Sequence, residues 1–116
     1  MRIIIGGDFS NDLSEEPLQE LSSKNAEKVF DKGVLRLFKT ADELVVNLEC
    51  AVTESENRIK KFGPHLKAPF GTCEVLKGAG VTFVTLSNNH IFDFGKEGVK
   101  DTMKELDKNG KIYRLR

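Results

Sequence analysis

Neither cysteine nor charge of one sign is abundant in this chain. The two cysteines, Cys50 and Cys73, are too few and too widely spaced for a disulfide scaffold or a structural zinc site. Both lie in apolar sequence, so we expect two buried free thiols. The 18 Lys and Arg residues are balanced by 18 Asp and Glu residues, and the pI is near 6.7. We therefore expect no nucleic-acid partner and no anionic membrane partner, because both call for a basic surface.

Long hydrophobic runs are also absent. No apolar stretch approaches the length of a membrane-spanning helix, and the N-terminus enters a strand-like run directly, without a hydrophobic signal-peptide region. We therefore expect no membrane segment within this chain. A length of 116 residues fits one domain with a single core, near the lower end for a layered α/β fold.

The main pattern in the sequence is an alternation of apolar runs and helical segments. The runs are rich in Ile, Val and Leu without clean polar alternation, which is typical of strands buried on both faces of a parallel sheet. Such alternation predicts an α/β fold with a layered, mainly parallel sheet and right-handed crossovers. The predicted strands are 2–6, 44–48 and 81–86, and the predicted helices are 33–40, 70–79 and 96–109, in the order β-α-β-α-β-α.

Each apolar run leads into polar side chains that are able to bind a metal. Asp8 follows the first run, Glu49 the second, and Asn89 and His90 the third. Because parallel strands end at a common edge, we expect these groups to converge. Carboxylate and amide oxygens and imidazole nitrogen bind divalent metals, and a bridging carboxylate lets two cations activate one water. The pattern favours a metal-assisted phosphoester hydrolase, with Glu49 as the bridge and His90 as proton donor or charge stabiliser.

Three further stretches lie outside this alternation. Residues 10–32 are polar, with a short helix expected after Ser14, and residues 53–69 form a second long connection. Both leave the same edge of the sheet, so they are candidate rims of a pocket or ordinary surface loops. Lys60 and Lys61 in the second connection either contact an anionic polymer or phosphate, or are simply solvated. The C-terminal residues 111–116 begin like a fourth strand.

Several short motifs combine into one recognisable set. They are Gly7-Asp8, Asn47-Leu48-Glu49, Ala51-Val52-Thr53, Ala68-Pro69, Gly80-Val81 and Ser87-Asn88-Asn89-His90-Ile91-Phe92-Asp93-Phe94-Gly95. Together they resemble the CapA family of bacterial capsule or poly-γ-glutamate synthesis proteins, whose fold is similar to that of calcineurin-like metallophosphoesterases. The resemblance extends along the chain to about Gly110.

The resemblance implies a role for each residue at the strand ends. Asp8 matches the first-strand metal ligand, Glu49 the bridging carboxylate and Asn89 the ligand of a second metal. His90 matches the acid or transition-state stabiliser and is also a candidate metal ligand. Asp93, which lies in the same signature, is the second candidate catalytic residue and would orient His90. The implied cofactor is a divalent metal, namely Mn, Fe or Zn.

The chain also departs from the metallophosphoesterase pattern. The segment Asp8-Phe9-Ser10 lacks the histidine of the usual Asp-x-His motif, and no Gly-His-x-His follows later. The resemblance therefore implies that residues 1–116 form a single partial domain, the N-terminal portion of such a protein and half of its sandwich. We expect this half to lack hydrolytic activity alone. Its uncovered sheet face would favour a homo-oligomer or a contact with the missing C-terminal half.

These observations leave several functions open. The first is capsule or poly-γ-glutamate biosynthesis or export through a metallophosphoesterase-type site, with an anionic polymer or a phosphoester as substrate. The second is a non-enzymatic polymer-binding or scaffold protein of the same fold, and the third is a folding fragment that only associates with itself. The resemblance implies the bacterial cell envelope or an extracytoplasmic location, and the cytoplasm if no leader was removed.

Overall fold

Four parallel strands form the main sheet, in the spatial order β1-β2-β5-β6. The computed structural model describes residues 1–11, 15–110 and 112–115. Ile5 pairs with Val45, and Val45 pairs in turn with Phe83, so the strands run side by side in the same direction. The predicted α/β fold with a parallel sheet is confirmed. The strands are β1 (Ile3–Phe9), β2 (Glu43–Leu48), β5 (Phe83–Thr85) and β6 (Tyr113–Leu115).

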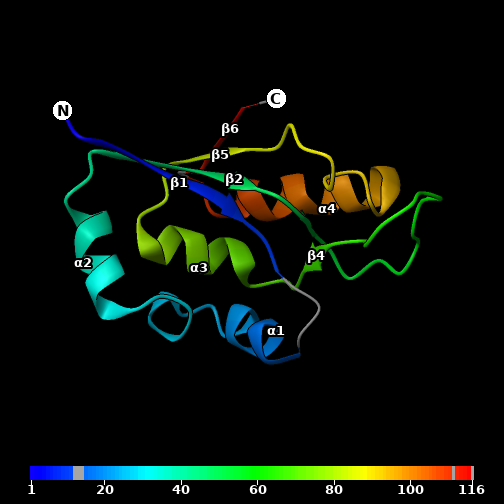
Figure 1. Cartoon of the computed structure of the whole chain (residues 1–116), viewed down its shortest axis with the longest axis horizontal. Coiled ribbons are helices and arrows are strands. Elements are labelled where there is room, and N and C mark those ends of the chain that lie inside the picture. Colours follow the sequence, from blue (N-terminus) through cyan, green and yellow to red (C-terminus); the bar gives the residue numbers. More distant parts are fainter. Residues whose placement is uncertain (12–14, 111, 116) are drawn as a thin grey trace.

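Helices connect the strands and pack on one side of the sheet. Figure 1 shows α1, α2 and α3 together on the same side of the strands, with α4 beside the ends of β2 and β5. The short helix expected after Ser14 is present as α1, and the expected fourth strand is present as β6, although residues 111 and 116 lie outside the described part. The helices are α1 (Glu15–Ser22), the 3-10 turn η1 (Ala26–Lys28), α2 (Lys32–Lys39), α3 (Thr72–Ala79) and α4 (Gly95–Lys108).

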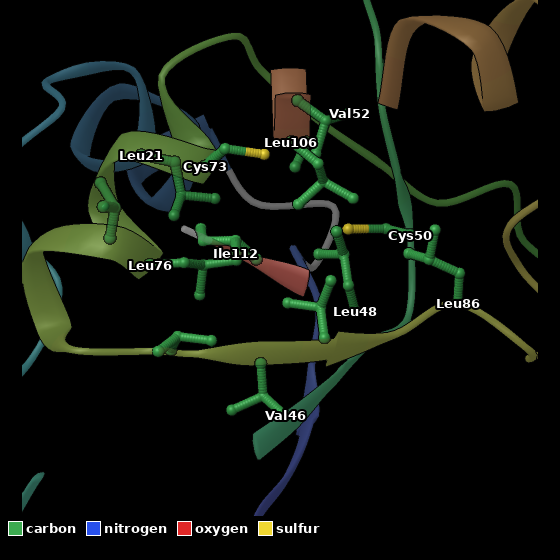
Figure 2. Close-up of a cluster of buried hydrophobic side chains, with 14 of the residues drawn as sticks. Leu21, Val46, Leu48, Cys50, Val52, Cys73, Leu76, Leu86, Leu106 and Ile112 are labelled. Carbon is green, nitrogen blue, oxygen red and sulfur yellow. The ribbon is translucent and has the colours of Figure 1, made fainter. Parts of the chain in front are cut away.

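The hydrophobic core lies between the sheet and the helices. Alternate residues of β2 point into it, because successive side chains of a strand face opposite ways. These are Leu44, Val46 and Leu48, which belong to one buried cluster with Leu76 of α3 and Leu106 of α4. Both predicted free thiols are confirmed, since Cys50 and Cys73 are unpaired and buried in this cluster (Figure 2).

The opposite face of the sheet is uncovered. Ile3 and Ile5 of β1 are 56% and 78% exposed, and Val45 and Phe83 on the neighbouring strands are only partly buried. The prediction of strands buried on both faces is therefore wrong for this chain, because the helices described here pack on one face alone. The uncovered face expected of half a sandwich is observed.

Two short strands, absent from the sequence prediction, form a separate small sheet. β3 (Ala51–Val52) pairs in parallel with β4 (Lys67–Ala68). The buried hydroxyl of Thr102 on α4 accepts a hydrogen bond of 2.9 Å from the Val52 N–H and so ties this sheet to the helix. Residues 53–66 between the two strands form a long loop that protrudes from the body of the molecule, at the right of Figure 1.

Candidate functional site

A register shift in β1 turns Asp8 toward the uncovered face. Ile5 pairs with Val45 but Asp8 pairs with Asn47, so β1 contains one residue more than β2 over this interval. A one-residue insertion reverses which face each following side chain occupies. Asp8 therefore shares a face with Asn47, whereas without the shift it would share the core face with Leu48.

The side chain of Asn47 links three strand ends. Its amide nitrogen donates to Asp8 Oδ1 at 2.9 Å, and its amide oxygen accepts from Thr85 Oγ1 at 2.9 Å. The same oxygen accepts from Asn88 Nδ2 at 3.2 Å, and that nitrogen also donates to the Leu48 carbonyl at 2.8 Å. The predicted common edge of the sheet is thus connected by a network of side-chain amides.

Asn88 shapes the turn that carries His90. Its side-chain oxygen accepts 3.0 Å hydrogen bonds from the backbone N–H groups of His90 and Ile91. Such local bonds from an asparagine side chain stabilise a tight turn after a strand. The neighbouring Asn89, which the sequence predicted as a metal ligand, is exposed to solvent. His90 itself is buried.

Asp8 and Glu49 lie within hydrogen-bonding reach of each other. Bonds from Asn47 and from Glu49 hold the pKa of Asp8 below its usual value. The bond to Asp8, then burial, then repulsion by Asp8 raise the pKa of Glu49, and the nearby His90 partly offsets them. Two carboxyl groups this close repel each other when both are ionised, and a cation between them would relieve that repulsion.

The buried Asp93 carboxylate contacts the His90 ring at the nitrogen that points away from Glu49. His90 Nδ1 lies 2.7 Å from Asp93 Oδ2, and His90 Nε2 faces Glu49 Oε1 at 4.0 Å. Lys61 forms an ion pair with Asp93 Oδ1, and the Leu66 N–H donates to Asp93 Oδ2 at 2.7 Å. The Asp93 carboxylate therefore orients the His90 ring so that Nε2 faces Glu49.

The donor set has the chemistry of a divalent-metal site, namely two neighbouring carboxylates, an imidazole and amide oxygens. Asp8, Glu49 and His90 lie on the same edge of the sheet, as the sequence predicted. Within the part of the chain that the structure describes, however, no three His, Cys, Asp or Glu side chains are grouped closely enough to hold a metal ion. The metal-ligand roles of these residues, of Asn89, and of Asp93 behind them stay predictions.

An apolar pocket of about 640 Å³ opens beside the polar edge. It lies between the segment that follows β5 and the helix α4, so the predicted pocket rims at 10–32 and 53–69 do not line it. The 53–69 stretch contributes instead to a smaller pocket of about 200 Å³ beside β4. The residues around the large pocket are Leu86, Ser87, Asn88, Ile91, Phe92, Val99 and Met103.

Three residues of the site were missed by sequence reasoning. Asn47 could have been found from the sequence, because asparagine is uncommon inside an apolar strand. The sequence predicts Asn89 as the site residue instead of the adjacent Asn88, because nothing in the sequence distinguishes their side-chain directions. Lys61 was interpreted as a polymer contact or a solvated charge, yet its side chain is only 20% exposed and pairs with Asp93.

Fold and site together define an α/β domain whose parallel sheet gathers carboxylate, amide and imidazole groups at one edge. The family described as Bacterial capsule synthesis protein PGA_cap matches residues 2–113, and this chain belongs to that family. The prediction of the CapA family is thereby confirmed.

Two curated relatives are similar to the chain. It is 33% identical over 86 residues to the PGA biosynthesis protein CapA of Bacillus subtilis (strain 168), a match that covers 73% of this chain and 22% of that protein. It is 48% identical over 40 residues to the Capsule biosynthesis protein CapA of Bacillus anthracis, covering 34% of this chain and 10% of that protein. The chain thus spans a minor part of the length of the relatives it matches. Among the described residues, no helix has the length and apolar character needed to cross a membrane.

Proposed function

We propose that this chain carries part of a divalent-metal site that serves capsule or poly-γ-glutamate biosynthesis or export. Family membership supports the biosynthetic role, and one observation supports the metal. The Asp8 and Glu49 carboxyl groups lie within hydrogen-bonding reach of each other, at the edge where His90 Nε2 lies 4.0 Å from Glu49 Oε1. Two carboxylates placed together beside an imidazole are the donor types that Mn, Fe and Zn accept.

In this proposal Asp8, Glu49, Asn89 and His90 would hold the metal. When bound, a divalent cation polarises a phosphoester oxygen or activates a water. As the alternative to binding the metal, a His90 ring protonated on both nitrogens would donate a proton to a leaving oxygen or stabilise negative charge there, and Asp93 orients the ring in either role. The substrate class is an anionic polymer or a phosphoester, and the chain alone is inactive because the metal site is incomplete.

Calorimetric titration with Mn²⁺ tests the site directly. Metal-stripped wild-type chain should bind Mn²⁺, and Asp8→Ala and His90→Ala should each lose that binding. Glu54→Gln removes a carboxylate from an exposed position of the 53–66 loop and serves as the matched control. Unchanged Mn²⁺ affinity in both site variants would refute the proposal.

A second function is favoured by the lack of a preformed group of three His, Cys, Asp or Glu side chains in the described residues. In that alternative the same edge binds the polymer without turning it over. It predicts that purified poly-γ-glutamate binds equally well with and without a chelator. Polymer binding that needs Mn²⁺ would instead support the metal site.

A further inference from the structure

The segment from Ile59 to Leu66 is organised around a single buried residue, Asp93. The Ile59 N–H donates to the Asp93 backbone carbonyl at 3.0 Å. The Leu66 N–H donates to Asp93 Oδ2 at 2.7 Å, and between these two anchors Lys61 reaches Asp93 Oδ1. His65 Nε2 lies 2.7 Å from the Ile59 carbonyl and closes the segment on itself. One residue of the His90 turn thus holds both ends of a segment that lies some thirty positions earlier in the chain.

Lys61 supplies the charge that this arrangement requires. The Asp93 side chain is fully buried, and an unpaired buried carboxylate would be strongly disfavoured. Lys61, the Leu66 N–H and His90 all contact this carboxylate. Lys61 is the charged partner among these three, and its side chain is 20% exposed. The neighbouring Lys60 and Arg58 are exposed to solvent.

The ionised carboxylate determines which ring nitrogen of His90 carries the proton. A carboxylate only accepts hydrogen bonds, so the 2.7 Å contact requires a proton on His90 Nδ1. In the neutral ring Nε2 is then the free acceptor, and it faces Glu49. Lys61 Nζ lies 3.4 Å from the same Nδ1, and an ammonium group has no lone pair to offer that proton. The proton on Nδ1 is therefore directed at Asp93 alone.

We infer that Lys61 is a positioning residue for His90. It holds the Asp93 carboxylate in place, and the carboxylate fixes the Nδ1–H tautomer that presents Nε2 to the Asp8 and Glu49 edge. The 59–66 segment is by this inference a structural part of the site. The importance of this tautomer for metal chemistry rests on the proposed function, but the tautomer itself does not.

Nitrogen NMR of the histidine side chains tests the inference. The chain contains only two histidines, His65 and His90, so the spectrum of a ¹⁵N-labelled sample is simple to assign. At about pH 8, above the usual imidazole pKa of about 6.5, wild type should show His90 as a single Nδ1–H tautomer. Lys61→Met should give a mixture of tautomers, because without the ion pair the Asp93 carboxylate is no longer held against Nδ1. Lys61→Arg should keep most of the single form because the charge remains.

Lys60→Met is the matched control, since it removes the same charge one position away at an exposed site. It should leave the His90 signals as in wild type. A Lys61→Met spectrum identical to that of wild type would overturn the inference. Should Lys61→Met fail to fold by circular dichroism, Lys61→Gln replaces it with the same expectation, because Gln keeps a donor but no charge.

Mn²⁺ affinity gives a second readout on the same samples. Loss of a residue that orients a metal ligand typically weakens metal binding by roughly 10- to 100-fold, so Lys61→Met should do so and Lys60→Met should not. If wild type binds no Mn²⁺, the proposed function fails, while the tautomer comparison still decides the role of Lys61. If wild type binds and Lys61→Met binds equally well with an unchanged tautomer, only the positioning role fails.

Discussion

The Asp8 carboxylate accepts a 2.9 Å hydrogen bond from the Asn47 side chain across two parallel strands. This contact depends on the extra residue that β1 contains between Ile5 and Asp8, where Gly7 adopts a positive φ of 78°. The left-handed region disfavours residues with a Cβ, and glycine at position 7 lets the backbone adopt the conformation that directs the Asp8 side chain toward Asn47.

Replacing Gly7 tests this dependence. A Cβ at this position meets no atom within 4 Å, so only the backbone penalty acts on Gly7→Ala. We expect a loss of about 1 kcal/mol in the free energy of unfolding, measured by urea denaturation. Gly7→Asn should cost less, because asparagine tolerates the left-handed region better than other residues. Equal stability of Gly7→Ala and wild type would show that the backbone at position 7 does not require glycine.

The buried Thr102 hydroxyl should contribute to the stability of the fold. It accepts from the Val52 N–H at 2.9 Å and donates to the Gly98 carbonyl at 2.7 Å. Thr102→Val keeps the shape but leaves the Val52 N–H unsatisfied, which should cost about 1–3 kcal/mol of unfolding free energy. Thr102→Ser keeps the hydroxyl and loses one methyl group, so it should cost about 1 kcal/mol. A valine variant more stable than the serine variant would contradict this account.

Removal of the Asp93 carboxylate should have a pH-dependent effect on stability. Because the pKa of Asp93 is lowered in the folded state, its stabilising contribution is present above the usual value of 3.8 and is lost as the pH falls through the lower folded-state pKa. Asp93→Asn should therefore cost about 3 kcal/mol at neutral pH, as expected for breaking a buried pair. The difference from wild type should shrink below about pH 4. Urea unfolding at neutral pH and below about pH 4 measures this difference in unfolding free energy. A difference that does not shrink in acid would show that the ionised Asp93 carboxylate is not its cause.

The two cysteines should be unreactive in the folded protein. Burial, the largest cause, raises the pKa of Cys50 and of Cys73 to about 12, and only the thiolate reacts quickly. Ellman's reagent at mildly alkaline pH should detect almost no thiol in the native chain and both thiols in denaturant. Fast modification of either cysteine without denaturant would mean that the core around it opens readily.

The uncovered sheet face should drive self-association. Ile5 is 78% exposed on that face, so Ile5→Lys should lower the mass measured by light scattering during size exclusion. Leu37→Lys changes a 54% exposed residue on α2 and should leave the mass unchanged. A monomeric wild type, or equal effects of both changes, would argue against association through the sheet.

The sequence predicts the alternation of strands and helices and the polar edge because both follow from local patterns. Apolar runs indicated strands, and helical periodicity between them required parallel crossovers, so Asp8, Glu49 and His90 were placed on one edge. The two-residue strands β3 and β4 have no such pattern, because a pairing that short depends on tertiary contacts. Burial on both faces is predicted from apolar runs that lack polar alternation, and such a run does not report whether a second layer is present.

Details of the site depend on long-range contacts that a sequence does not display. Lys61 and Lys60 are adjacent identical residues, and only the fold brings the first of them onto Asp93. Asn88 and Asn89 are likewise adjacent and identical, and only the fold distinguishes them. The side-chain bonds of Asn88 to the turn and to Asn47 follow from the geometry after β5.

The polar edge and the uncovered face are parts of the same surface. Asn47 lies on β2 two residues beyond Val45, and alternate residues of a strand share a face, so the network around Asp8 continues directly into the apolar face that contains Ile5. Any layer that covers Ile5 therefore also borders Asp8. Thermodynamic linkage then makes the effects of layer association and of cation binding on each other equal. If association of that layer strengthens cation binding at the edge by some factor, a bound cation must strengthen association of the layer by the same factor.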